Sequence, residues 1–95
     1  GISGITAGKV GDRLRLIGKS RQVICITHLP QIAATADHHF LIRKKAEGTS
    51  VRTDVEMLDE AASVEELARL LGGANVTERV MESAKELKEL AKCER

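Results

Sequence analysis

The sequence is poor in residues that characterise several common classes of protein. Its 95 residues include one aromatic, Phe40, and two cysteines, Cys25 and Cys93. A single aromatic offers no series of stacking surfaces for the bases of single-stranded nucleic acid. The two cysteines are too far apart for a CxxC motif and provide no disulfide framework. No apolar run approaches the roughly 18 residues of a membrane span, so we expect a cytoplasmic protein without a membrane partner.

The sequence also lacks the loop that holds nucleotide phosphates in many ATPases. No GxxxxGK(S/T) motif occurs, so the chain has neither that backbone cradle nor its lysine. The net charge is +1, with acidic and basic residues interleaved. This balance argues against a domain that binds DNA by charge alone, because such domains carry a basic patch. The one basic cluster, at residues 43–45, is interpreted as the solvated end of a strand.

The first third of the chain predicts a helix followed by a buried strand. Over residues 5–20, apolar side chains recur at the spacing of one helix face, namely Ala7, Val10, Leu14 and Ile17. Residues 23–26 form an unbroken apolar run rich in β-branched side chains. This run predicts a strand over residues 22–28 that is buried on both faces of a parallel sheet, with Cys25 in the core. A helix and then a buried strand are typical of an α/β fold.

A β-hairpin is predicted in the middle of the chain. Pro30 is well placed as the first residue of a short helix, because proline suits that position. After residue 37 the periodicity of the sequence changes to two. Residues 51–57 alternate apolar or threonine side chains with charged ones, which predicts a half-exposed hairpin over residues 38–58 with its turn at 47–49.

Two helices are predicted over residues 63–93. Ser63 and Glu66 have the spacing of a capping box, and Thr77 can cap the second helix. Gly72 and Gly73 end the first helix because glycine adopts the left-handed conformation at little cost. The buried faces are predicted to be Val64, Leu67, Ala68 and Leu71 in the first helix and Val80, Ala84, Leu87 and Ala91 in the second.

His28 is the single residue that says most about chemistry. Ligands of open α/β sheets bind at the carboxyl ends of the strands, and His28 comes at the end of the predicted strand. An imidazole with a reference pKa of about 6.5 can donate or accept a hydrogen bond near neutral pH. It therefore suits phosphate sensing or the positioning of a water molecule. The alternative is a histidine that caps the following helix or satisfies a loop carbonyl.

Two other catalytic or metal arrangements are weaker. Asp37, His38 and His39 could form a metal site with His28, but adjacent histidines on a strand point to opposite faces. We therefore expect no metal site. Ser3 could join His28 and an acid in a hydrolytic triad, but no GxSxG elbow supports this arrangement. Ser3 is better interpreted as a helix cap.

Three stretches together resemble the RecN family of SMC-like, ABC-type ATPases, which act in bacterial DNA repair. Residues 20–34, SRQVICITHLPQIAA, with ADHHF at 36–40, resemble the switch-histidine region of that family. The residues GISG at 1–4 are similar to its D-loop, and VEELARLLGG at 64–73 resembles its terminal region. The resemblance covers nearly the whole chain. It implies the C-terminal part of an ABC-type (P-loop) ATPase head, from the D-loop onward.

The resemblance also implies a role for each matched residue. His28 would be the catalytic switch histidine that faces the γ-phosphate and the attacking water, and Gln31 would support its loop. The D-loop would reach across a head-to-head homodimer toward the partner's nucleotide; its residues are Gly1, Ile2, Ser3 and Gly4. ATP and Mg²⁺ would be bound by the whole protein, because the phosphate loop, the signature motif and the Walker B acids would come from its N-terminal part. We expect neither to bind this chain alone.

For the whole protein, the resemblance implies ATP-dependent repair of DNA double-strand breaks by recombination, in the bacterial cytoplasm at the nucleoid. Other parts of that protein would contact DNA. A different class of function stays open from the residues themselves, because terminal helices and strand edges can mediate association. The chain could be a stand-alone interaction or dimerisation module without nucleotide chemistry.

Overall fold

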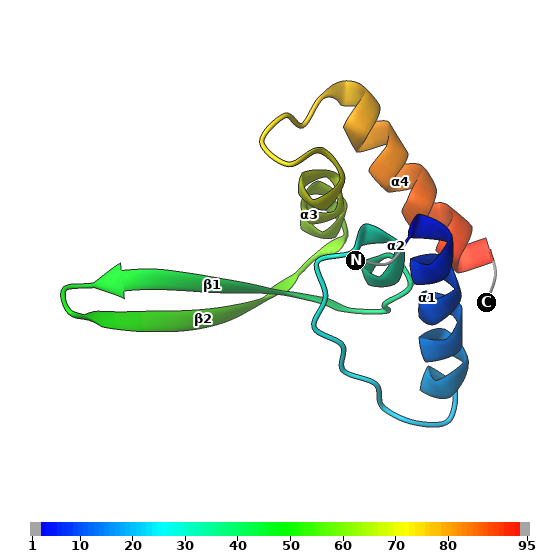
Figure 1. Ribbon diagram of the computed structural model, residues 1–95, viewed down its shortest axis with the longest axis horizontal. Helices are drawn as coiled ribbons and strands as arrows, with labels where there is room; N and C mark the ends of the chain where they lie inside the picture. The colour runs from blue at the N-terminus through cyan, green and yellow to red at the C-terminus, as the bar shows by residue number, and fades with distance from the viewer. Residues whose placement is uncertain (1–2, 94–95) are drawn as a thin grey trace.

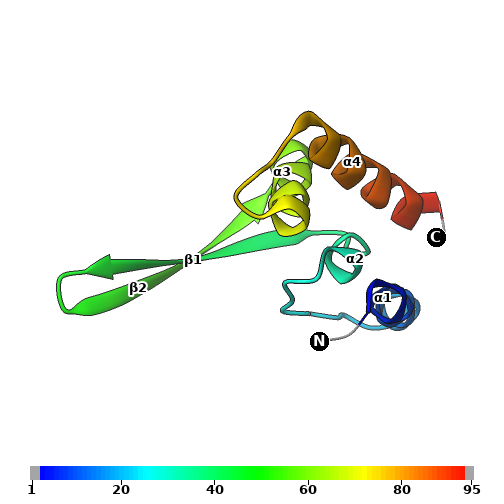
Figure 2. The same ribbon diagram turned by 45° about the horizontal axis from the view of Figure 1, so that its top comes forward.

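Four helices and one β-hairpin make up the fold. The computed structural model describes residues 3–93. Its elements are α1 (Gly4–Gly18), α2 (Pro30–Ala33), β1 (His39–Glu47), β2 (Ser50–Leu58), α3 (Glu60–Gly72) and α4 (Glu78–Cys93). The helices gather at one end of the molecule and the hairpin extends away from them (Figures 1 and 2). The predicted mixture of helices with a hairpin is confirmed.

Local side-chain chemistry sets where the helices begin and end. Ser3 caps α1, as predicted, and Thr77 caps α4, since its Oγ1 accepts from the Val80 amide at 3.3 Å. The predicted capping box at Ser63 is wrong, because α3 begins earlier. Asp59 is its N-cap, and Asp59 Oδ1 accepts from the Ala62 amide at 2.8 Å. Gly73 ends α3 with a φ of 62° and a ψ of −125°, a backbone conformation that glycine adopts readily because it has no Cβ.

The core lies between α3 and α4, with α2 beneath it. Its buried members are mostly small: Ala34, Val64, Leu67, Ala68, Ala84 and Ala91. Val80 and Leu87 of α4 pack against this cluster, so the inner face predicted for α4 is confirmed. The face predicted for α3 is confirmed except at Leu71, which is exposed. Because most of these side chains are alanines, the two helices lie close together over little buried volume.

The hairpin has a regular antiparallel register that pairs His39 with Leu58 and Glu47 with Ser50. Gly48 lies in the two-residue turn with a φ of 62°, a conformation that glycine adopts without strain. Cross-strand pairs on one face are apolar, including Phe40 with Met57 and Ile42 with Val55. All four are exposed. The hairpin is therefore more exposed than the half-buried one predicted from the sequence.

The predicted buried strand over residues 22–28 is not formed. Residues 22–29 carry no regular secondary structure, and Ile24 and Ile26 are 84% and 85% exposed. Cys25, expected in the core, is exposed as well. The physical reason is pairing: a central parallel strand needs hydrogen-bonded neighbours, and within residues 3–93 the only strands, β1 and β2, pair with each other. The stretch is apolar, but it has no strand partner among the described residues.

Candidate functional site

His28 lies between the apolar stretch and α2, and its side chain is exposed. The backbone beside it is fixed by the Leu29 amide, which donates to Thr27 Oγ1 at 3.0 Å. Leu29 is the N-cap of α2 and Pro30 its first residue, as predicted for Pro30. His28 is thus not the cap residue of this helix. Its imidazole lies on the surface, where a ligand can reach it.

The described residues of the predicted D-loop, Ser3 and Gly4, lie at the start of α1. Ser3 Oγ accepts from the Thr6 amide at 3.2 Å and is 3.0 Å from Thr6 Oγ1. Gly4 lies against α2, since a Cβ at Gly4 would be 3.3 Å from Gln31 Nε2. The structure therefore brings two predicted site residues, Gly4 and Gln31, together. Gly1 and Ile2 lie outside the described residues.

A second close contact between α1 and α2 is formed at Gly11, which is buried. A Cβ at Gly11 would lie 2.9 Å from Thr35 Cγ2 and 3.2 Å from the Gln31 carbonyl oxygen. Only glycine allows the two backbones to approach this closely. A hollow of about 200 Å³ opens beside the contact, where α1, α2 and α4 meet. Across this junction, Arg15 Nη1 of α1 donates to the Ala91 carbonyl of α4 at 3.4 Å.

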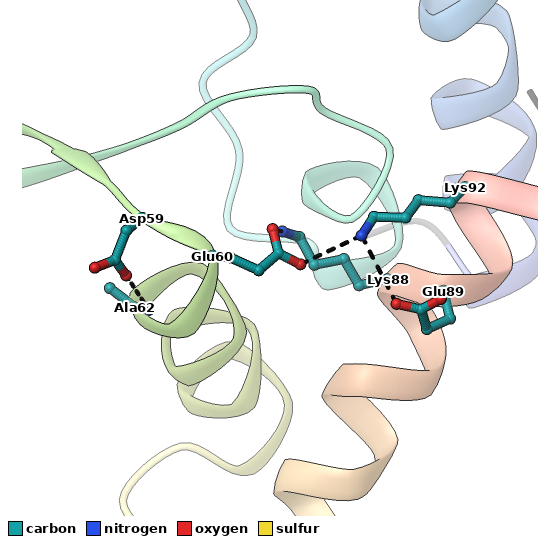
Figure 3. Close-up of polar contacts among 6 residues, drawn as sticks. All are labelled: Asp59, Glu60, Ala62, Lys88, Glu89 and Lys92. Atoms are coloured by element: carbon teal, nitrogen blue, oxygen red, sulfur yellow. Dashed lines mark hydrogen bonds and ion pairs between the residues drawn. The ribbon is translucent and has the colours of Figure 1, made fainter.

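A separate polar cluster lies where the hairpin meets α3 and α4 (Figure 3). Lys88 of α4 is only 6% exposed, and its Nζ donates to Glu60 Oε2 at 2.6 Å. Lys92 Nζ donates to the other oxygen of Glu60 at 3.4 Å. The hydrogen bond from Lys88 is the main reason why the pKa of Glu60 is lowered. Glu60 therefore stays ionised and fixes the first turn of α3 to α4.

His39, the first residue of β1, belongs to the same cluster. Its Nε2 is buried and has no hydrogen-bond partner among the described residues. Burial lowers the pKa of His39, because the charged ring loses hydration there. The charges of Lys88 and, to a smaller extent, His38 lower this pKa further, while Glu60 opposes them. His39 is thus held neutral at the junction.

Residues 3–93 contain neither a cluster of metal ligands nor a membrane-spanning helix. Within residues 3–93, no group of three or more histidine, cysteine, aspartate or glutamate side chains is arranged to hold a metal ion. In the same residues, no helix has the length and apolar character needed to cross a membrane.

Comparison with known proteins finds RecN from several bacteria. The chain is 46% identical over 87 residues to the DNA repair protein RecN of Vibrio cholerae, a match that covers 92% of the chain and 16% of that protein. It is 46% identical over 91 residues to RecN of Halalkalibacterium halodurans, or 96% of the chain and 16% of that protein. The chain is a RecN-like segment. No family model matches it.

The match to RecN spans the whole of the candidate site. RecN of Streptomyces coelicolor is 39% identical over 95 residues, which is 100% of this chain and 17% of that protein. The matched region therefore includes His28, Gln31 and residues 1–4. The chain is only about one sixth as long as these RecN proteins.

Three residues of the RecN-like segment that shape the site were missed from the sequence: Gly11, Thr35 and Arg15. The sequence does contain a signal for Gly11. Glycine inside a helix is less favourable than alanine by about 1 kcal/mol, so Gly8 and Gly11 within a predicted helix point to close packing. The spacing alone does not say which of them packs. Thr35 and Arg15 carried no comparable signal, since their contacts depend on the tertiary arrangement.

Proposed function

We propose that this chain completes an ABC-type ATPase head that acts in DNA repair. In that head, His28 contacts the γ-phosphate and the attacking water, and residues 1–4 reach the nucleotide held by a second copy of the head. The proposal is supported by the similarity to proteins named DNA repair protein RecN. It is also supported by the exposed position of His28 after an apolar stretch.

One observation carries the proposal, namely the exposure of Ile24 and Ile26 just before His28. Both are more than four-fifths exposed, although residues 23–26 have the composition of a strand buried on both faces. Covering them with neighbouring parallel strands would place His28 at the carboxyl edge of a sheet. That edge is where ligands of open α/β sheets bind.

The proposed role of His28 is to orient a water molecule, which an imidazole ring can do. Phosphoryl transfer depends mainly on positioning and on stabilising charge, which the nucleotide-bound Mg²⁺ assists. A neutral imidazole donates through one nitrogen and accepts through the other, so His28 can orient a water molecule beside a phosphate oxygen. The chain has no phosphate loop, and the remainder of the head would hold the phosphates. With a net charge of +1, this chain leaves DNA contact to other parts of the protein.

The test uses a whole RecN-like protein that carries this segment. His28→Ala should lower kcat for ATP by about 10²-fold or more, as expected for loss of a residue that orients the reacting water. The Kd for ATP should stay close to that of the wild type. His38→Ala is the matched control, because His38 is also exposed and lies in the same region; it should keep full turnover. Equal loss of ATP binding and turnover would contradict a sensing role for His28.

A second candidate is an interaction module without nucleotide chemistry. It is favoured by the exposed apolar face of the hairpin, which includes Phe40, Ile42, Val55 and Met57. Faces of this kind often mark sites of protein contact. The same experiment separates the two candidates, because an interaction module predicts that ATP turnover does not depend on His28.

A further inference from the structure

The contact between α1 and α2 is made at two glycines on the same side of α1. Gly4 and Gly11 are seven residues apart, or about two helical turns. A Cβ at Gly4 would meet the Gln31 side chain at 3.3 Å. At Gly11, a Cβ would meet Thr35 Cγ2 at 2.9 Å and the Gln31 carbonyl oxygen at 3.2 Å. Both glycines therefore face α2 and the turn that follows it.

The other glycines of α1 have open surroundings. A Cβ at Gly8 or Gly18 would have no atom within 4 Å, apart from neighbouring parts of its own helix. The tight approach is thus confined to Gly4 and Gly11, while Gly8, on the same side of α1, borders the hollow between α1, α2 and α4. At Gly11 the closest atom is Thr35 Cγ2, so an added methyl group would have to displace Thr35 and with it push α1 away from α2. The Gln31 carbonyl oxygen, at 3.2 Å, leaves room for that methyl group only within a few tenths of an ångström.

The two helices begin at the two parts of the proposed site. α1 starts directly after Ser3, and α2 starts two residues after His28. The separation of the helices at Gly11 therefore sets the separation between Ser3, at the start of α1, and the loop of His28. We propose that Gly11 is a positioning residue. Because it has no side chain, α1 and α2 can pack closely, and this packing fixes the distance between the start of α1 and the His28 loop of the ATPase site. This inference rests on the proposed function and adds to it the residue that couples the two parts.

The test introduces Gly11→Ala into the whole RecN-like protein. Since a misplacement of about 1 Å can lower a rate by about 10²-fold, a shift of a few tenths of an ångström should lower kcat by roughly tenfold. The KM for ATP should stay near the wild-type value, since an interaction lost only in the transition state lowers kcat. Gly8→Ala is the matched control, because it adds the same methyl group to the same helix in open space; it should change neither constant.

Rescue distinguishes positioning from a general loss of structure. Thr35→Ser removes the Cγ2 methyl group and keeps the hydroxyl, which donates to the Ile32 carbonyl at 2.7 Å. Gly11→Ala combined with Thr35→Ser should therefore recover kcat to within about threefold of the wild type, because the closest clash is gone. Should Gly11→Ala alone fail to bind ATP, recovery of both binding and turnover in the double variant decides in favour of the contact. No recovery overturns the inference.

A second readout needs no nucleotide. In NMR spectra of the 95-residue chain, Gly11→Ala should shift the backbone amide signals of α2 and of Ser3, and Gly8→Ala should not. Thr35→Ser should move the shifted signals back. Equal effects of the two glycine substitutions would overturn the inference.

The His28→Ala protein keeps the two proposals separate. If His28→Ala loses turnover and Gly11→Ala does not, only the positioning role of Gly11 falls. If His28→Ala keeps full turnover, the proposed function falls, and the role of Gly11 falls with it.

Discussion

His39 is the residue at which the hairpin, α3 and α4 come together, and its ring is partly withdrawn from water. The groups that act on it are Lys88 from α4, Glu60 from α3, and His38, which directly precedes β1. Because burial and the Lys88 charge lower the pKa of His39, the unfolded chain binds a proton more readily than the folded one. Stability should then decrease as the pH falls below the unfolded pKa of about 6.5.

The pH dependence of unfolding checks this expectation. The melting temperature of the chain should fall between pH 7.5 and pH 5, a range that stays above the titration of Glu60, whose pKa is lowered from 4.5. His39→Gln should flatten this decrease, because glutamine does not titrate. His28→Gln is the control, since His28 is exposed and is not among the groups that shift the pKa of His39, and it should leave the slope in place. An unchanged slope in His39→Gln would show that another group is responsible.

At the scale of single residues, short-range chemistry was predictable and tertiary contacts were not. Ser3 and Thr77 were placed correctly because a cap needs only a side chain and an amide a few residues away. Pro30 was placed correctly because its fixed φ suits the first residue of a helix. The chosen cap at Ser63 was wrong because Asp59, four residues earlier, provides a carboxylate at the true start of α3. Lys88 is outside the buried face predicted for the last helix, yet it is buried beside Glu60.

Among the elements, α3 depends on a single well-formed cap. Asp59→Ala should lower the free energy of unfolding by about 1 kcal/mol, since it leaves an amide of the first turn without its acceptor. Figure 3 shows this contact between Asp59 and the Ala62 amide. Asp59→Asn keeps an acceptor oxygen and should retain most of the stability. Chemical denaturation of the three proteins measures the difference, and a loss in Asp59→Asn equal to that in Asp59→Ala would point to charge rather than capping.

The elements that form through local contacts were the ones predicted well. The hairpin has a two-residue turn and a strict alternation, so its register follows from the sequence nearby. Residues 22–28 show the opposite case. Their composition is that of a buried strand, but a parallel strand exists only beside partners that are distant in sequence. The pattern of apolar residues predicts that a segment is buried, but it does not show whether a neighbouring strand is present to pair with it.

Taken as a whole, the molecule has a small core and a large apolar surface. Of the described residues, Leu67 is the largest fully buried side chain. Many large apolar side chains are exposed, among them Ile5, Leu16, Ile24, Ile26 and Val51. The candidate site likewise depends on packing that the sequence alone does not reveal. His28 was placed from the sequence at the end of a buried strand that the structure does not form, and the contacts of Gly4 with Gln31 and of Gly11 with Thr35 required the packed helices.

The exposed apolar stretch before His28 should be detectable in solution. The double variant Ile24→Ser and Ile26→Ser should bind less of a hydrophobic dye than the wild-type chain. Its free energy of unfolding should change by no more than about 0.5 kcal/mol, because the substituted side chains are on the surface. Arg21→Ser with Gln22→Ser is the control, since both residues are exposed in the same stretch. Dye binding that is unaffected by the isoleucine substitutions would place the responsible surface elsewhere.

The order of the contacts along the chain has a consequence for how the molecule folds. The main packed pairs are α1 with α2, β1 with β2, and α3 with α4, all neighbours in sequence. Closing short loops takes little chain entropy, so such pairs form quickly and independently of one another. The hydrogen bond from Arg15 to Ala91 joins residues 76 positions apart and should form late. These pairs can therefore assemble one after another as the chain is synthesised, whereas residues 22–28 find no strand partner among the described residues at any stage.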